Sequence, residues 1–169
     1  MLFRSRISGF VGTALVEKLV QRHGIDEETK THLKKSLRQN LERKEEAAAS
    51  QDDKMRKEIH EAWKMGVIDE TFVEEVTESG EKERLIECLS LLVNEPRTAV
   101  EKVFASRSAK AVTALTWSAG LPMRVAFKIQ TMVMKLPADE LLPARSGVDY
   151  PLAEDEMRWH LSYFGFTKK

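Results

Sequence analysis

Few residues in this chain of 169 have the types and spacing that chemistry requires, because it contains only four histidines and one cysteine. His60 and Glu61 match the start of the zinc-protease helix motif, which needs a second histidine one turn later on the same helical face. Lys64 occupies that position, so the zinc motif is broken. Cys88 lies among leucines, where a buried and unreactive thiol is the simpler interpretation. We therefore expect no catalytic residue, no metal site and no cofactor.

His60 also belongs to a weaker pattern, with Lys64 one helical turn further on and Gly66 beyond it. The pattern distantly resembles the phosphoacceptor motif of histidine phosphotransfer domains, in which a lysine steadies the phosphoryl oxygens. That family has its lysine three residues after the histidine with a glycine directly following, whereas here the lysine comes four residues later and Met65 intervenes. A plain surface histidine is the simpler interpretation. A histidine phosphoacceptor at His60 stays open as an alternative function.

A third pattern lies within residues 111–136 and resembles a DNA-binding helix-turn-helix. Gly120 and Leu121 match the turn that locks two helices together, so that the second helix can enter the major groove. Arg124 and Lys128 are the bases of that second helix. Most of its other residues are apolar, which leaves few side chains to read base edges. A nucleic-acid binder is therefore a second alternative function, ranked behind a protein binder.

The composition of the chain limits which secondary-structure elements can position these residues. Hydrophobic residues make up 42% and charged residues 32% of the chain, while glycine and proline number only 8 and 5, and Pro96 is the first proline. Scarce turn residues and apolar positions at the helical period predict an all-α fold. A single cysteine indicates a reducing compartment, so we expect a cytoplasmic protein. The interrupted apolar stretch 7–16 predicts an amphipathic helix rather than a membrane span.

The segment 26–65 is expected to be helical, highly charged and partly projecting. Nineteen of the 36 residues in 26–61 are charged, and neither glycine nor proline occurs between residues 26 and 65. Ser50 to Asp52 offer an N-cap and a break, so we predict two helices, about 26–49 and 52–65. Three leucines repeat every four residues and form a narrow stripe that suits a partner helix. These leucines are Leu33, Leu37 and Leu41.

After Gly66 the chain changes to short helices with wide apolar faces, which predicts a compact half. Asp69 is the expected N-cap of the first of these helices, and Gly80 is its expected end. Further short helices follow up to Pro137, and the residues after it are expected to form a loop to about 151.

A last helix is expected from about 153 to 164. It carries Trp159, Tyr163 and Phe164, an aromatic concentration that we expect to anchor the C-terminal end on the core.

Charge is unevenly distributed although the formal net charge is zero. Residues 66–95, the acidic block, hold nine acids and two bases, a balance of −7; residues 96–136, the basic block, hold seven bases and one acid, a balance of +6. Opposite blocks in adjacent helices attract each other. We expect this pairing to be intramolecular, in preference to an external acidic partner.

One stretch of the chain carries a family resemblance. It runs from Leu91 to Ile129 and contains an Arg-Ser pair, an Ala-Leu pair and the sequence Ala-Gly-Leu-Pro. The matching residues are Pro96, Arg107, Ser108, Ala114, Leu115, Ala119, Gly120, Leu121 and Pro122. On these residues the chain resembles a bacterial domain family of unknown function, DUF2336, over about residues 66–136. The resemblance implies stacked helical hairpins of the HEAT type, no catalytic residues and a regulatory role through interaction.

We therefore expect an all-α chain with N-terminal helices in 1–65 and a compact helical-repeat domain in 66–169. Its expected function is that of a non-enzymatic protein-interaction or signalling module, without a membrane span. The partner-binding candidates are Leu33, Leu37, Leu41, Arg107, Lys110, Arg124 and Lys128.

Overall fold

The structure is a computed structural model that describes residues 27–166, apart from some side chains in the first half of the first helix. The side chains of Leu33, Leu37 and Leu41 are among those outside the description, as is the helix expected around residues 7–16. The chain divides into two units, Met1–Lys54 and Met55–Lys169. The second is called the compact unit below.

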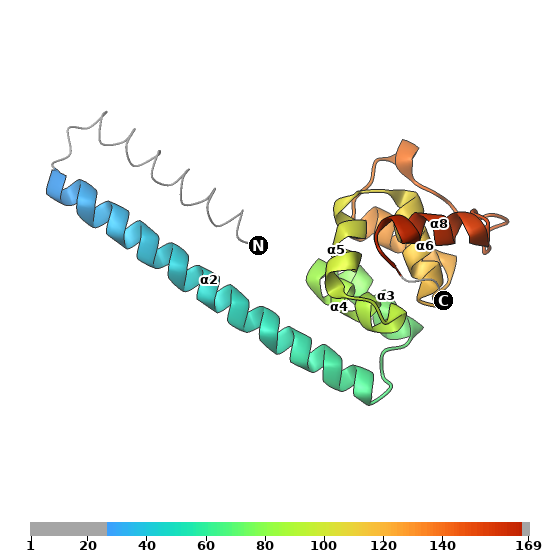
Figure 1. The fold of residues 1–169 in the computed structure, drawn as a ribbon, viewed down its shortest axis with the longest axis horizontal. Coiled ribbons are helices and arrows are strands. Elements are labelled where there is room, and N and C mark those ends of the chain that lie inside the picture. Colours follow the sequence, from blue (N-terminus) through green and yellow to red (C-terminus); the bar gives the residue numbers. More distant parts are fainter. Residues whose placement is uncertain (1–26, 167–169) are drawn as a thin grey trace. The chain divides into compact units, whose positions relative to one another are not determined.

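Helices build the described part of the chain, and no strand is present there beyond an isolated bridge between Arg145 and Asp149 (Figure 1). The all-α prediction is confirmed. The elements are α2 (Glu27–Lys64), α3 (Glu70–Ser79), α4 (Lys82–Val93), α5 (Arg97–Ala105), α6 (Ala109–Ser118), α7 (Met123–Lys128), the π-helix η1 (Ile129–Val133), the 3-10 helix η2 (Ala138–Glu140) and α8 (Glu154–Tyr163).

The prediction of two helices in 26–65 is wrong, because α2 runs without a break from Glu27 to Lys64. A break near Ser50 would create two more helix ends with unsatisfied backbone groups and would require a second nucleation. One weak N-cap signal does not offset that cost, since the residues around it include three consecutive alanines, the best helix formers.

The unit boundary lies at Lys54–Met55, inside α2, and not at residue 65 where the composition changes. Ile59 is only 1% exposed, and Met55 and Ala62 pack against the same core. The last turns of α2 therefore belong to the compact unit. The sequence does not reveal that these turns belong to the compact unit, because apolar residues are sparse among the charged residues of that segment.

The turn from α2 into α3 follows the residues expected there. Gly66 has a φ of 70°, a left-handed conformation that glycine adopts without steric cost, and its N–H and that of Val67 bond back to the last turn of α2. Asp69 is the N-cap of α3 and accepts the Phe72 N–H at 2.9 Å. Both predicted features of α3, its N-cap and its end at Gly80, are confirmed.

The core of the compact unit forms where α6 packs against α4, α5, α7 and α8. Helices that follow one another in the chain contact each other, as stacked hairpins would, but α3 also contacts α7. In an open solenoid each repeat touches only its neighbours. The HEAT-like arrangement therefore stays a prediction, and the α3–α7 contact is the feature that positions the charged residues described next.

Gln130 fixes the loop after η1 on the helices. It is fully buried, and its side-chain oxygen accepts the Leu142 N–H at 2.8 Å while its Nε2 donates to Thr113 Oγ1 at 3.1 Å. At the other end of the loop, the Tyr150 hydroxyl donates to the Leu121 carbonyl at 2.5 Å. Burial raises the pKa of Tyr150, which keeps this hydroxyl protonated.

Candidate interaction surfaces

The acidic and basic blocks meet where α3 lies against α7. Lys128 Nζ lies 2.6 Å from Glu78 Oε1 and 3.2 Å from Glu74 Oε1, and Arg124 Nε lies 3.0 Å from Glu74 Oε1. Arg124 also pairs with Glu70. Hydrogen bonds from Lys128 to Glu78 and Glu74 raise the pKa of that lysine. The expected intramolecular pairing of the two blocks is confirmed for these residues.

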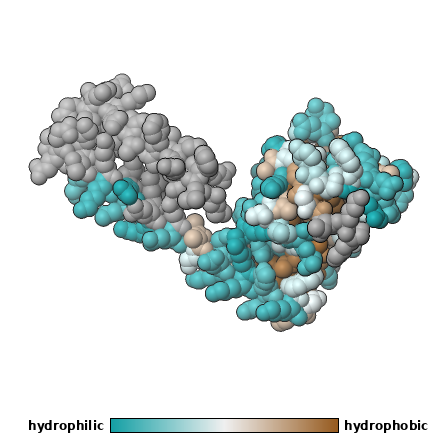
Figure 2. Space-filling model, viewed as in Figure 1, coloured by the Kyte–Doolittle hydropathy of each residue, from teal (hydrophilic) through white to brown (hydrophobic). Residues whose placement is uncertain are grey.

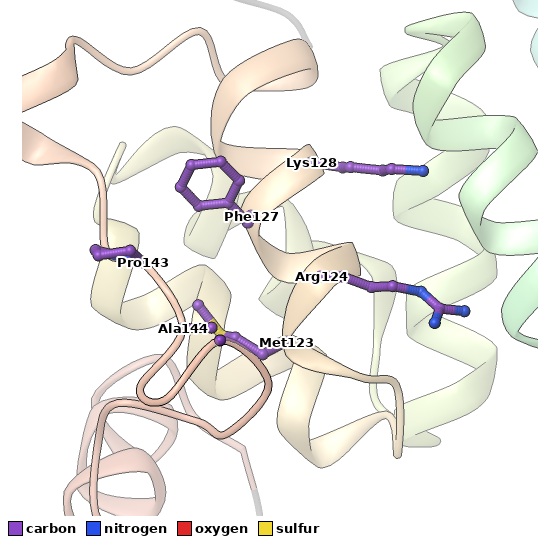
Figure 3. Close-up of a pocket in the computed structure, with 7 residues that line it drawn as sticks. Met123, Arg124, Phe127, Lys128, Pro143 and Ala144 are labelled. Carbon is purple, nitrogen blue, oxygen red and sulfur yellow. The ribbon is translucent and has the colours of Figure 1, made fainter.

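This pairing bears directly on the helix-turn-helix alternative. In that motif Arg124 and Lys128 of the second helix would reach the DNA, whereas here both extend toward the glutamates of α3 (Figure 3). α7 also continues directly into the π-helix η1, so regular α-helical geometry ends about one turn and a half after Met123. A DNA duplex would have to compete with three carboxylates for the side chains of Arg124 and Lys128, so the geometry does not favour nucleic-acid binding at this helix.

The other partner-binding candidates fall in three different places. Lys110 Nζ pairs with Glu156 Oε1 at 2.9 Å, which joins α6 to α8. Arg107 is exposed at the turn between α5 and α6, and its Nη2 donates to the Lys135 carbonyl at 3.3 Å. Leu33, Leu37 and Leu41 lie along α2, where the structure describes the backbone and not these side chains.

A charge cluster around the buried Glu87 joins α2, α4 and α5, and sequence reasoning missed it. The Glu87 side chain on α4 is only 7% exposed, and its carboxylate lies 3.1 Å from Arg97 Nη1 and 3.1 Å from His60 Nε2. Arg97 also pairs with Glu101 at 2.8 Å and with Glu83. No local pattern marks Glu87, because it is one of nine acids in the acidic block.

The cluster also bears on the phosphoacceptor alternative at His60. A phosphoacceptor needs a free ring nitrogen to attack the phosphoryl group. The Nε2 of His60 faces the carboxylate of Glu87, which would repel a phosphoryl group approaching that nitrogen. The geometry therefore favours a structural role for His60, which holds the end of α2 on α4.

The outer face of α8 carries exposed aromatic side chains. Trp159 is 64% exposed and Tyr163 is 80% exposed. The prediction that the aromatic residues of this helix anchor the C-terminal end is wrong for these two, because Met157 and Leu161 face the core instead and are 1% and 6% exposed. It is confirmed for Phe164, which packs against the core. Residues four apart share one helical face. α8 thus presents Trp159 and Tyr163 together on its solvent side.

A shallow apolar groove lies between α7 and the loop that Gln130 holds. It has a volume of about 400 Å³, and Met123, Phe127, Pro143 and Ala144 line it together with Gly147 and the stems of the two α7 bases. Figure 3 shows Phe127 directed toward Pro143, on the side of α7 away from Arg124 and Lys128. The sequence could not reveal the groove, because its two walls are separated by the whole of η1 and η2.

Neither a metal site nor a reactive thiol is found in the part of the chain that the structure describes. There, no three residues of the His, Cys, Asp and Glu types gather as metal ligands. Burial raises the pKa of Cys88 to about 12, so its thiol stays protonated and unreactive, as expected. None of the helices between residues 27 and 166 is both long and apolar enough to cross a membrane.

Comparison of the chain with protein-family models, with curated proteins and with solved structures finds no match.

Proposed function

We propose that this chain is a non-enzymatic protein-interaction module whose main binding surface is the outer face of α8. The observation that carries the proposal is the exposure of Trp159 and Tyr163, at 64% and 80%, on one face of an ordered helix. Tryptophan and tyrosine are enriched among the residues that contribute most to binding at protein interfaces. Neither side chain packs into the core, and each makes one edge-on ring contact, Trp159 with His160 and Tyr163 with Phe164.

The helix that carries the two aromatic residues is held firmly. Met157 and Leu161 are buried on its inner side, and α8 packs along α6. Lys110 Nζ adds an ion pair with Glu156, and Arg158 lies over the ring of Trp117 with 5.6 Å between the guanidinium carbon and the ring centroid. A rigid helix presents its side chains to a partner with little ordering cost.

Apolar surface gathers on the compact unit, while the described surface of α2 is mainly hydrophilic (Figure 2). Apolar patches of this kind are typical of binding sites. The proposal retains the resemblance to DUF2336 as a second line of support for a regulatory interaction, and it places the module in the cytoplasm, where the buried Cys88 remains a thiol.

The test is affinity capture from the native cell with the full chain as bait, followed by mass spectrometry. The double variant Trp159→Ala, Tyr163→Ala should recover about tenfold less of any specific partner than the unmodified chain. The matched control is Trp63→Ala, Phe127→Ala, which also removes one tryptophan and one other exposed aromatic residue, at 41% and 37% exposure.

Circular dichroism must show that both double variants keep their helices. Equal recovery with both variants would place the binding surface elsewhere on the chain, and no specific partner with any form of the bait would contradict the proposal as a whole.

A further inference from the structure

The seven bases of the basic block divide into two groups in the structure. Four of them form ion pairs with carboxylates: Arg97, Lys110, Arg124 and Lys128. The other three are exposed, and within the described part of the chain they have no carboxylate partner: Lys102, Arg107 and Lys135.

Two of these three bases lie together although 28 residues separate them. Arg107 Nη2 donates to the Lys135 carbonyl at 3.3 Å, so the turn between α5 and α6 meets the end of η1. Asp139 and Glu140, the carboxylates that follow Lys135 most closely in the chain, form no ion pair with it. Neighbouring like charges repel each other, so neither basic residue stabilises the charge of the other.

The backbone at this corner carries a second cost. Arg107 and Lys135 have φ angles of 53° and 51°, in the left-handed region that residues with a Cβ seldom adopt. The compact unit uses glycine at five other left-handed positions, Gly66 and Gly80 among them, and the small polar residues Asn94 and Ser146 at two more. Glycine would fit both turns without strain, yet two bases occupy them side by side. An unfavourable conformation combined with uncompensated charge is typical of a residue kept for binding.

We propose that Arg107 and Lys135 form a docking site for an acidic segment of a protein partner. The proposal rests on the interaction function argued above and names the chemistry of one partner region. Two neighbouring exposed basic residues without a carboxylate partner complement a short run of aspartate and glutamate residues. The chain as a whole has a formal net charge of zero, so an acidic ligand gains nothing from the protein's overall charge and depends on local groups of exposed basic residues.

The corner favours an acidic protein segment over nucleic acid. Proteins bind single-stranded nucleic acid where exposed aromatic side chains, next to basic residues, stack on the nucleobases. Phe104, the aromatic residue at the end of α5, is only 3% exposed and cannot stack in this way. Duplex DNA is held through many phosphate contacts, which two basic residues do not supply.

The test uses the full chain and a fluorescent peptide of eight glutamates, with a peptide of eight glutamines as the uncharged ligand. Fluorescence anisotropy at low salt should show binding of the glutamate peptide, and added salt should weaken it. Arg107→Asn, Lys135→Asn should weaken binding about tenfold, because it removes two ion pairs. Asparagine tolerates the left-handed conformation, so these turns are kept.

The matched control is Lys57→Gln, Lys64→Gln, which changes the net charge by the same amount on exposed residues of α2. It should bind the glutamate peptide like the unmodified chain. Equal weakening by both variants, or no binding at low salt, would overturn the proposal. Tighter binding of an eight-nucleotide single strand, lost in the asparagine variant, would assign the corner to nucleic acid and also overturn it.

Thermal unfolding of the same asparagine variant provides a second readout. If Arg107 and Lys135 are kept for binding, the melting temperature should stay the same or rise, since strain and repulsion are both reduced. A clear fall would show that the two bases serve the fold. The asparagine variant leaves Trp159 and Tyr163 unchanged. A negative result with it would therefore not contradict the α8 surface, and a negative result with the aromatic variants would not contradict the docking site at Arg107 and Lys135.

Discussion

The guanidinium of Arg97 on α5 lies 3.1 Å from the carboxylate of Glu87 on α4, and the two side chains are only 11% and 7% exposed. A buried charge without its partner is costly. Removing either member of this pair should therefore destabilise the fold far more than removing a member of an exposed pair. Arg97→Met should lower the free energy of unfolding by about 3 kcal/mol. Urea denaturation followed by circular dichroism measures the loss.

The control for this pair is Arg84→Met. Arg84 pairs with Glu58 and Glu81, whose side chains are 64% and 53% exposed, so its loss should cost less than about 1 kcal/mol. Equal losses for the two arginine variants would show that the buried cluster contributes no more than a surface ion pair.

The pairing of Lys110 with Glu156 predicts a pH dependence. The hydrogen bond from Lys110 lowers the pKa of the Glu156 carboxyl, with His160 contributing less. A lowered pKa stabilises the fold above the ordinary carboxyl pKa, and this stabilisation is lost as the pH falls through the lowered value. Lys110→Met should therefore return the pKa of Glu156 toward its ordinary value, as measured by carbon NMR of the carboxyl group. Lys128→Met, which removes a base from α7, should leave it unchanged.

Gln130 predicts how the loop between η1 and α8 is held. Gln130→Leu keeps the size of the side chain but removes the acceptor of the Leu142 N–H and the donor to Thr113. Leaving these buried groups unpaired should cost about 2 kcal/mol, and hydrogen exchange of the Leu142 amide should become faster. Tyr150→Phe removes one hydrogen bond at the far end of the loop and should leave that amide protected. Unchanged exchange in the leucine variant would show that other contacts hold the loop.

The leucine stripe of α2 predicts a packed helix face. We expect Leu33, Leu37 and Leu41 to pack against another helix, either from the N-terminal residues or from a second copy of the chain. Leu37→Ala should then lower the melting temperature, because truncation of a buried leucine costs about 2 to 5 kcal/mol. A dimer seam would also make the melting temperature depend on protein concentration. Gln39→Ala is the control on the same helix, and its side chain is exposed.

Light scattering at several concentrations completes that experiment. An unchanged melting temperature together with an unchanged oligomeric state would contradict the packing of the stripe.

Local signals in the sequence determined the elements of the compact unit and its class. Asp69 before an apolar run and Gly80 after it set the two ends of α3, since capping and a left-handed turn depend only on nearby residues. The scarcity of glycine and proline determined the all-α class. The attraction between the acidic and basic blocks was also predictable, because it follows from net charge and needs no detailed geometry.

Only the tertiary structure decided which of the similar residues matter. Glu87 looks like the other acids of its block until the fold buries it between Arg97 and His60. Trp159 and Tyr163 look like core residues until Met157 and Leu161 take the inner face of α8.

The basic block shows the same division. Arg107 and Lys135 cannot be told from Arg124 and Lys128 by composition, and they differ only because α3 brings its glutamates to α7 and not to the turn after α5. Helical periodicity says which residues share a face, but which face meets another helix depends on contacts between residues far apart in the chain.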